Sequence, residues 1–248
     1  MTIQLTDFIH LPRRIERSVR FRLRKARQQL LDRYEGNAFD GVLDYDWGGI
    51  PFSRIAFVSA AVARVQAAKG QCRYLEIGCF NNECFYAIPA EIKVGVDPVR
   101  GGTLRMTSDA FFAQNKETFD VIYVDGLHEY GQCQRDAINA LAALNTGGFL
   151  LLHDLLPLNW KMEHVPRLQA IWSGDVWKVA FELMATTGID FVVAEADQGV
   201  GIARKISNDA TYKDLSGELR TQRFRYLFDH RKRLPLRTAE QALTFVRG

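Results

Sequence analysis

The segment from Tyr74 to Asp97 constrains the fold of this chain more than any other part of the sequence. It contains two short apolar runs, each with one carboxylate at or near its end, Glu76 and Asp97, joined by a turn and a helical stretch. In such a βα unit, the carboxyl ends of consecutive parallel strands meet at one edge of the sheet, where nucleoside ligands of open α/β folds bind. We therefore expect Glu76 and Asp97 to lie side by side in a nucleoside site, and their spacing favours an adenosyl ligand.

The composition is that of a soluble globular protein. With 248 residues, 47% of them hydrophobic, the chain can bury one sizeable core and form one domain with appendages. No apolar run approaches the roughly 18 residues of a membrane-spanning helix, and the basic N-terminal stretch lacks the apolar core of an export signal. We therefore expect a cytoplasmic protein. The cysteines form no CxxC pair, so we expect buried thiols rather than disulfides or a zinc site at Cys72, Cys79, Cys84 and Cys133.

Positive charge is concentrated at the two ends of the chain. Residues 1–35 hold nine Lys and Arg against four Asp and Glu, residues 216–248 hold eight against three, and the rest of the chain is acidic. Within the first segment, apolar residues recur at spacings of three and four with arginines mostly between them, which predicts a basic amphipathic helix. Its apolar positions are Leu11, Ile15, Val19, Leu23, Ala26 and Leu30.

Two interpretations of this helix are open. It packs by its apolar stripe on the domain or on a second subunit of a homodimer, or it contacts an anionic surface such as membrane lipid or a phosphorylated glycolipid. The second interpretation would hold the protein at the inner face of the membrane. A nucleic-acid partner is not expected, because neither basic end interleaves aromatic residues in a recognisable binding module.

Strands and helices alternate between residues 52 and 205. The apolar patterns predict helices over 52–69, 132–144 and 167–187, and strands over 73–77, 92–96, 119–125 and 149–152. The last stretch, DFVVAEADQGVGIARK, predicts two strands joined by a tight turn at Asp197–Gly199. A purely parallel dinucleotide-binding fold would not normally end in such a hairpin, so the hairpin favours a different cofactor.

Five motifs occur in order along the same region. They are LEIG at 75–78, VGVDP at 94–98, TSDAFF at 107–112, FDVIYVDGLHEY at 119–130 and GGFLLLHD at 147–154. In this order the motifs resemble those of the class I S-adenosylmethionine-dependent methyltransferases, especially the group with a DGxH motif and a glycine-glycine-strand-His-Asp motif. The resemblance covers residues 74–205.

The resemblance implies a Rossmann-like α/β fold with a seven-strand, mostly parallel sheet and an antiparallel last strand. On this basis we expect three parts: a basic amphipathic helix and loop at 1–50, the methyltransferase domain at 51–206 and a basic helical extension at 207–248. It also implies that S-adenosylmethionine is the methyl donor in an O-methylation. The expected acceptor is a hydroxyl of a small molecule or glycan, on a saccharide, a glycolipid or a secondary metabolite.

The methyl donor presents a ribose diol and an amino-acid tail, so its site needs hydrogen-bond acceptors and close approach of the backbone. By resemblance, Asp97 accepts from the ribose, Glu76 lies near the methionine end, and Gly78 lets the turn pass close to the ligand. Asn82 stands where family members usually have glycine, and asparagine is the next most tolerant of a left-handed backbone. The other residues expected at the cofactor are Cys79, Pro98, Ser108, Asp109, Asp125 and Gly126. Of these, Ser108 and Asp109 either cap a helix or bond the adenine amino group.

Methyl transfer to a hydroxyl requires alignment of the acceptor and a base that takes its proton. The candidates stand at the ends of two strands that would be neighbours in this fold: Asp125, His128, His153 and Asp154. Either histidine titrates near neutrality and qualifies as the base. Some related O-methyltransferases bind a divalent cation such as Mg²⁺ at these strand ends, where Asp125 and Asp154 are the expected ligands. Leu155 stands where catechol-type sites have a further amide ligand, and a histidine ligand instead would favour a softer metal.

The acceptor site is expected under the loop LLPLNWKMEHVP at 155–166, with Asp46 and Trp47 from the N-terminal loop. Two alternatives to an active methyltransferase are open. One is a catalytically silent scaffold protein that binds the adenosyl ligand, which Asn82 and Leu155 would permit. The other is a different nucleotide-dependent Rossmann-type enzyme such as a dehydrogenase, which would need G-x-G-x-x-G where this chain has GCFNNE.

Overall fold

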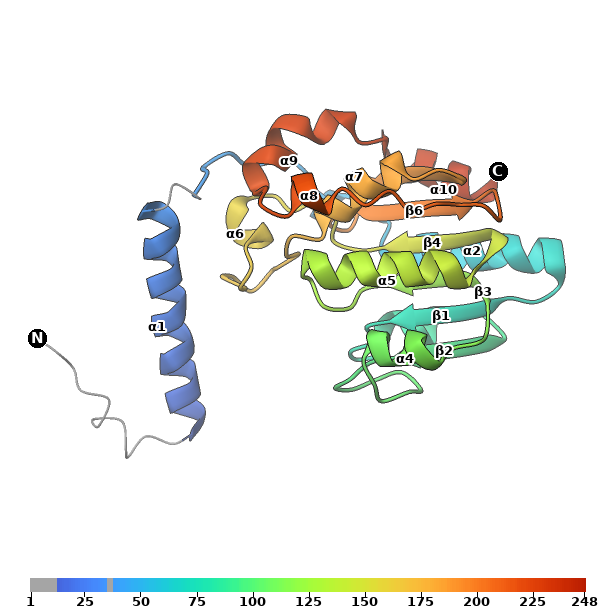
Figure 1. The fold of residues 1–248 in the computed structure, drawn as a ribbon, viewed down its shortest axis with the longest axis horizontal. Coiled ribbons are helices and arrows are strands. Elements are labelled where there is room, and N and C mark those ends of the chain that lie inside the picture. The colour runs from blue at the N-terminus through green and yellow to red at the C-terminus, as the bar shows by residue number, and fades with distance from the viewer. Residues whose placement is uncertain (1–12, 35–37) are drawn as a thin grey trace, which may run out of the picture. The chain divides into compact units, whose positions relative to one another are not determined.

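The computed structural model describes residues 13–34 and 38–248 (Figure 1). The chain divides into two compact units, Met1–Asp40 and Gly41–Gly248, and each is described by itself. Every residue predicted for the cofactor, the chemistry or the metal belongs to the second unit. The three-part division expected at residues 50 and 206 stays a prediction.

The first unit contains a 22-residue helix, α1, which spans Arg13–Tyr34. Three of its apolar side chains, Phe21, Leu23 and Leu30, are exposed by 55%, 58% and 69%. Leu11, the first position of the predicted apolar stripe, lies outside the described residues. Among the helices of residues 13–34 and 38–248, none is long and apolar enough to span a membrane.

One seven-strand sheet forms the centre of the second unit. Its strands are β1 (Arg73–Ile77), β2 (Ile92–Val96), β3 (Phe119–Val124), β4 (Leu144–Leu152), β5 (Ile189–Ala194), β6 (Val200–Lys205) and β7 (Leu236–Arg237). Across the sheet the order is β2-β1-β3-β4-β6-β5-β7. The first four strands of this order are parallel, β6 is antiparallel to both β4 and β5, and the short β7 pairs in parallel with β5. The predicted Rossmann-like fold with a seven-strand, mostly parallel sheet is confirmed, and its antiparallel member is β6.

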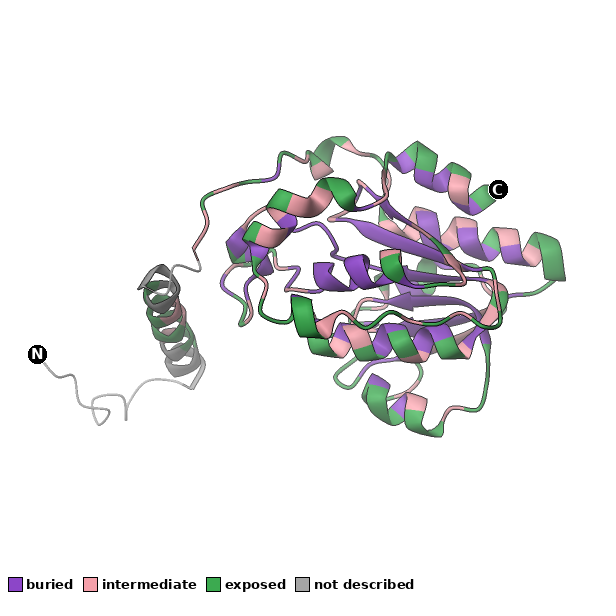
Figure 2. Ribbon diagram, turned by 45° about the horizontal axis from the view of Figure 1, so that its top comes forward, coloured by how far each residue is buried: buried purple, intermediate pink, exposed green. Residues whose placement is uncertain are grey.

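Helices cover both faces of this sheet (Figure 1). They are η2 (Trp47–Gly49), α2 (Arg54–Lys69), α3 (Glu83–Ala87), α4 (Ser108–Gln114), α5 (Tyr130–Ala143), α6 (Trp160–Glu163), α7 (Trp177–Ala185), α8 (Ser216–Leu219), α9 (Phe224–His230), η3 (Arg231–Arg233) and α10 (Ala239–Arg247). On one face α2 packs with α10 against β3, β4 and β5, whereas α5 packs on β3 and β4 with α4 and α7 beside it. Figure 2 shows the buried strands between helices whose outer sides are exposed.

Strands β3 and β4 are mostly apolar where helices cover both of their faces. Every residue of β3 is buried, and so is the Phe149–Leu152 part of β4. Continuous apolar runs of this kind are typical of parallel strands with helices on both sides. The four cysteines are free and buried, as predicted. The sheet is therefore a rigid support for the loops at its edge.

The register of the parallel strands brings four strand ends to the same level. Ile77 pairs with Val96 on one side and with Val124 on the other, and Val124 pairs with Leu152. The residue after each of these positions therefore stands at one edge of the sheet: Gly78, Asp97, Asp125 and His153. This edge is where the site was expected from the sequence.

The long helix predicted over 167–187 is wrong, because only its second half is helical, as α7. Gly174 has a left-handed backbone with φ of 66°, and a Cβ at this position would overlap the carbonyl oxygen of His128. A left-handed residue interrupts a helix. The residues before it form a loop instead, and Ile171 and Trp172 of this loop reach the sheet edge.

Candidate active site

A cleft of about 950 Å³, the main cleft, lies at the carboxyl edge of the parallel strands. Most of the predicted site residues line it: Glu76, Gly78, Cys79, Asp97, Pro98, Ser108, Asp125, Gly126, His128, His153 and Asp154. Asn82 and Asp109 are not among the lining residues. The predicted cofactor residues and the predicted catalytic residues thus share one cavity.

Asp97 follows β2, and backbone N–H groups hold its carboxylate. Phe80 donates to Oδ2 at 2.9 Å, and Val99 and Arg100 each donate to Oδ1 at 2.8 Å. Although burial opposes it, these bonds and the nearby Arg105 hold the pKa of Asp97 below its usual range. A carboxylate oxygen accepts about two hydrogen bonds, so Oδ2 keeps one position for a ligand hydroxyl.

Glu76 lies inside β1 and is 1% exposed, yet it is one of the residues that line the main cleft. The hydroxyl of Tyr74 donates to its Oε2 at 2.5 Å. Burial raises the pKa of Glu76 to about 7. The hydrogen bond from Tyr74 opposes this rise, and the negative charge of Asp125 adds to it. Glu76 therefore ionises near neutral pH, and a cationic group bound next to it would favour the ionised form.

Three residues of the turn after β1 have a left-handed backbone: Gly78, Phe80 and Asn82. Gly78 has φ of 87°, and a Cβ there would overlap the carbonyl oxygen of Asp125. Asn82 has φ of 64°, and its Oδ1 accepts a hydrogen bond from the backbone N–H of Gly102 at 2.6 Å. Asparagine therefore adopts the backbone that the motif's usual glycine would adopt, while its side chain fixes the neighbouring loop.

Ser108 and Asp109 differ in their positions. The helix-capping interpretation is wrong for both, because Thr107 caps α4 by accepting from the N–H of Ala110 at 3.2 Å. Ser108 is buried and lines the main cleft, and its Oγ accepts from Gln132 Nε2 at 3.1 Å. Asp109 is exposed and does not line the cleft, and its Oδ1 accepts from the same Gln132 Nε2 at 3.1 Å.

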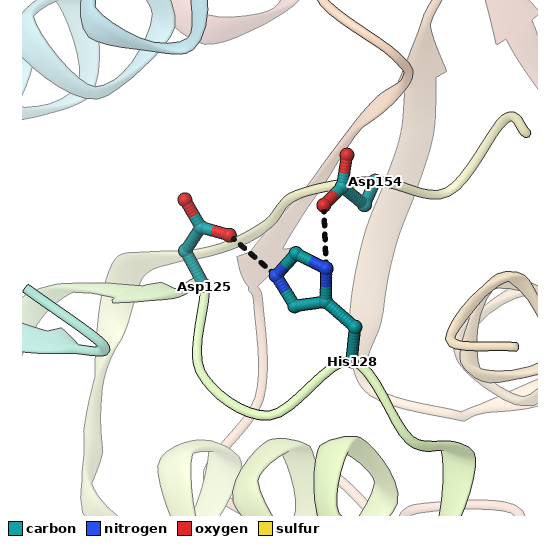
Figure 3. A group of neighbouring side chains, drawn as sticks. All are labelled: Asp125, His128 and Asp154. Atoms are coloured by element: carbon teal, nitrogen blue, oxygen red, sulfur yellow. Dashed lines mark ion pairs between the residues drawn. The ribbon is translucent and has the colours of Figure 1, made fainter. Parts of the chain in front are cut away.

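His128 lies between two carboxylates (Figure 3). Its Nε2 is 3.4 Å from Oδ1 of Asp125, and its Nδ1 is 3.1 Å from Oδ2 of Asp154 and 3.0 Å from the carbonyl oxygen of Trp172. The imidazole ring stacks on Trp172 with centroids 5.3 Å apart. With 24% of its side chain exposed, His128 is accessible from the cleft.

His153 is the more deeply buried histidine, with 5% of its side chain exposed. Its Nδ1 is 3.5 Å from a carboxylate oxygen of Asp125 and 3.5 Å from one of Asp154. Its Nε2 lies 2.8 Å from the carbonyl oxygen of Asp197. Asp154 has a left-handed backbone with φ of 65°, a strained conformation that non-glycine residues adopt most often at functional sites.

The residues of this histidine–aspartate cluster shift the pKa values of one another. Although burial opposes it, His153 and His128 hold the pKa of Asp125 well below its usual range. Burial also opposes protonation of the histidines, but Asp125 and Asp154 raise the pKa of His128 and, more strongly, that of His153. Burial raises the pKa of Asp154 despite both histidines. A proton on either histidine is therefore stabilised by the neighbouring aspartates.

The sequence interpretation did not include several residues at the site. Arg54 donates to Oδ2 of Asp197 through its backbone N–H at 2.7 Å and through Nη1 at 3.1 Å, and its Nε is 3.8 Å from Asp125. Gln132 and the buried Asp136 also line the cleft, and burial raises the pKa of Asp136 to about 6. Arg54 begins a helix and Asp197 lies in a turn. At these two positions the sequence indicates the secondary structure but not the contact between the two side chains.

The same cluster contains a set of metal-ligand atoms. One ligand atom each from Asp125, His128 and Asp154 lies within 4.8 Å of the others. Two carboxylate oxygens and one imidazole nitrogen suit a transition metal better than Mg²⁺, which prefers oxygen alone. Both ring nitrogens of His128 face a carboxylate oxygen. To bind a metal, one of them must be deprotonated and direct its lone pair to the ion instead.

A family model matches the part of the chain that contains the strand ends. Residues 58–155 match a family model described as a methyltransferase domain. The match spans the strand-end residues from Glu76 to Asp154, and the predicted resemblance to class I methyltransferases is confirmed for this part of the chain. The narrower DGxH subgroup stays a prediction.

Several solved structures have a similar fold. Rv0187 from MTB, solved with a cofactor bound, is 12% identical with a TM-score of 0.48, over 64% of this chain and 84% of its own. The O-methyltransferase TomG from Streptomyces achromogenes, solved with SAM, is 12% identical with a TM-score of 0.43, over 61% and 79%. An O-methyltransferase from Bacillus cereus, solved with SAH, is 13% identical with a TM-score of 0.43, over 72% and 89%. The search of curated proteins found no match.

Proposed function

We propose that this chain transfers a methyl group from S-adenosylmethionine to a hydroxyl group. The observation that carries the proposal is the single cleft in which Asp97 and Glu76 lie next to the histidine–aspartate cluster. A strand-end carboxylate with a free acceptor position suits a ribose hydroxyl, and a buried carboxyl that ionises near neutrality suits an ammonium group. The methyltransferase domain match supports the same reaction class.

Each predicted cofactor residue has a defined part in this proposal. Oδ2 of Asp97 accepts from the ribose, and Glu76 pairs with the ammonium of the methionine portion. Gly78 has no side chain, which lets the turn pass close to the ligand. The remaining residues form the walls of the nucleoside site: Cys79, Pro98, Ser108, Asp125 and Gly126. Asn82 and Asp109 act from behind this wall, by fixing Gly102 and Gln132.

For the chemistry we assign the base to His128. When bound, the donor supplies an electrophilic methyl group, and transfer breaks its S–C bond, leaves the electron pair on sulfur and requires removal of the acceptor's hydroxyl proton. His128 is the histidine with more surface in the cleft, whereas His153 is tied to Asp197 and buried. Asp125 and Asp154 orient His128 and stabilise its protonated form. His153 positions both aspartates.

A metal-dependent variant of this mechanism uses the same residues differently. Asp125, Asp154 and His128 would hold a divalent cation that binds the acceptor oxygen and lowers its pKa. His128 would then be a ligand, and His153 the only histidine of the cluster left to act as base. The donor set favours manganese or zinc over magnesium.

The test is turnover of the full chain with S-adenosylmethionine and a panel of hydroxylated acceptors, with and without a chelator. Methyl transfer that persists in chelator supports His128 as the base. Activity that is lost in chelator and restored by Mn²⁺ or Zn²⁺ supports the metal-dependent variant. Adenosylhomocysteine binding without turnover of any acceptor would favour the silent scaffold, and binding of NAD alone would contradict the methyltransferase proposal.

For the N-terminal helix we propose contact with an anionic surface, lipid or glycolipid. Exposed arginines at positions 22, 24 and 27 lie on the same helix as the exposed Leu23 and Leu30, which share one helix face because they are seven residues apart. This combination is typical of helices that lie in a membrane interface. Burial of the same apolar side chains in a homodimer is the competing proposal.

A further inference from the structure

A second cavity of about 410 Å³, the side pocket, lies beside the main cleft in the unit Gly41–Gly248. Its walls are mostly apolar and come from three separate segments of the chain. The apolar side chains are Trp47, Ile50, Phe52, Leu158, Met162 and Ile171. Ile171 and Gln198 line both cavities, so the side pocket and the main cleft are neighbours that share a boundary.

The polar wall of the side pocket is joined directly to the catalytic cluster. Asp197 lines the side pocket, and its carbonyl oxygen lies 2.8 Å from Nε2 of His153. Arg54 donates twice to Oδ2 of the Asp197 carboxylate, at 2.7 and 3.1 Å, and Oδ1 lies 3.5 Å from Nε2 of His153. A molecule that reaches from the side pocket past Gln198 therefore enters the main cleft beside the histidines.

Two residues of the side pocket each have a buried polar atom with no hydrogen-bond partner within the described residues: Nε1 of Trp47 and Oε1 of Gln198. Both residues line the side pocket. The indole ring of Trp47 is held in place by stacking on Tyr45, with centroids 4.6 Å apart and an interplanar angle of 15°. Buried polar groups normally find partners, and a ligand in the cavity that these two residues line would supply one acceptor and one donor.

We propose that the side pocket binds the ring system of the methyl acceptor and that this acceptor is an aromatic alcohol. The proposal rests on the proposed function, because it assigns the substrate class of that reaction. An aromatic body fills the apolar walls, an oxygen on it accepts from Trp47, and a hydroxyl or N–H donates to Gln198. The reacting hydroxyl extends past Ile171 toward His128.

The same walls are poorly suited to a saccharide. A sugar ring carries a hydroxyl on most of its carbons, and each buried hydroxyl needs a partner. Besides Trp47 and Gln198, the described lining offers two polar side-chain groups, the hydroxyl of Ser53 and Oδ1 of Asp197, since Arg54 bonds Oδ2. An aromatic alcohol needs no more polar partners than the pocket provides.

The experiment is calorimetric titration of the full chain, saturated with adenosylhomocysteine, with 2-naphthol and separately with methyl α-glucoside. We expect 2-naphthol to bind and the glucoside not to bind. The Ile50→Trp variant fills the pocket and should weaken 2-naphthol binding at least about ten-fold. Val42→Trp is the matched control, because Val42 belongs to the same segment, is 63% exposed and does not line the pocket.

A second variant tests the polar contact without filling the cavity. Trp47→Phe keeps an aromatic ring and removes only the N–H donor, so we expect roughly five-fold weaker 2-naphthol binding. This variant also replaces Ile50→Trp if that protein does not fold, as judged by its melting temperature.

Three results would overturn the proposal: no binding of 2-naphthol, 2-naphthol binding that is unchanged in both Ile50→Trp and Trp47→Phe, or glucoside binding that Ile50→Trp abolishes. Failure of the proposed function has a different signature, because it appears as loss of adenosylhomocysteine binding in the unmodified chain. In that case, 2-naphthol binding without adenosylhomocysteine, weakened by Ile50→Trp, would still support the side pocket as an aromatic site.

Discussion

Two buried acids of the main cleft, Glu76 inside β1 and Asp97 just after β2, have pKa values shifted in opposite directions. Asp97 is surrounded by N–H donors, which lower its pKa, whereas Glu76 accepts from one phenol in an apolar environment and has its pKa raised to about 7. Asp97 is therefore a fixed charge over the physiological range. The charge of Glu76 depends on pH, and so would any interaction with an ammonium group.

The residue scale gives a prediction of pH dependence at Glu76. Its charged form predominates above its pKa of about 7, so affinity for adenosylhomocysteine should rise roughly ten-fold from pH 6 to pH 8. Calorimetry across this range on the unmodified chain and on Glu76→Gln measures the effect. The variant should bind weakly at both pH values, and an equally steep pH dependence in the variant would contradict the role of Glu76.

The second prediction at this scale concerns the base. His128→Asn removes the proton acceptor nearest the open cleft and should lower the rate of methyl transfer by roughly 10² to 10⁴. Adenosylhomocysteine affinity should change little, because the assigned cofactor contacts do not include His128. The control is His230→Asn, at the end of α9 and outside the main cleft, which should retain full turnover. Unchanged turnover in His128→Asn would shift the assignment to His153.

The strand-end turn shows how elements bring distant groups together. The backbone of Gly78 passes the carbonyl group of Asp125 so closely that no side chain fits, and this contact joins the end of β1 to the end of β3. The cofactor side and the catalytic side of the cleft are therefore connected through backbone. A change at this glycine should disturb both.

At the element scale we predict that Gly78→Ala costs at least about 2 kcal/mol of unfolding free energy, from left-handed strain plus the overlap with Asp125. Gly70→Ala is the matched control. Gly70 also has positive φ, 81°, but a Cβ there has open space, so its cost should be about 1 kcal/mol. Denaturant unfolding of both variants gives the comparison. Equal costs would contradict the close approach at Gly78.

Elements with strong local signals could be predicted from the sequence. The bounds of β1 and β2 match the predicted 73–77 and 92–96, because short apolar runs flanked by turn residues define them. The 167–187 prediction was wrong, because the contact between Gly174 and His128 that prevents a helix joins residues far apart in the chain. Arg54 and Asp197 were missed for the same reason, since their pairing depends on the tertiary fold.

The site residues that could be predicted from the sequence lie at the ends of strands. Asp97, Asp125 and His153 each follow a predicted strand, and the parallel register places them at one edge. Which of the two histidines acts as the base could not be predicted in this way. It depends on burial, which differs because Asp197 lies over His153 while His128 faces the cleft.

On the scale of the whole molecule, the proposed chemistry belongs to one unit. The described residues that line the two cavities all belong to Gly41–Gly248, whereas the basic helix α1 belongs to the other unit. The cofactor site and the proposed surface-binding helix should therefore be separable by experiment.

We predict that a chain starting at Gly41 binds adenosylhomocysteine with unchanged affinity but no longer binds vesicles containing anionic lipid. Calorimetry measures the first property and vesicle co-sedimentation the second. Vesicle binding that persists without residues 1–40 would contradict the role proposed for α1. Light scattering tests the competing homodimer, because a dimer mass that is retained by the shortened chain would rule out α1 as its interface.

The most direct measurement is the affinity of Asp97→Asn for adenosylhomocysteine beside that of a control, Asp120→Asn. Asp120 is also buried and accepts from a backbone N–H, that of Arg73 at 3.0 Å, but it does not line the main cleft. Loss of a charge-assisted hydrogen bond to the ribose should weaken binding by Asp97→Asn roughly ten- to hundred-fold, while Asp120→Asn binds as the unmodified chain does. Equal affinity in Asp97→Asn and the unmodified chain would contradict the adenosyl site in this cleft.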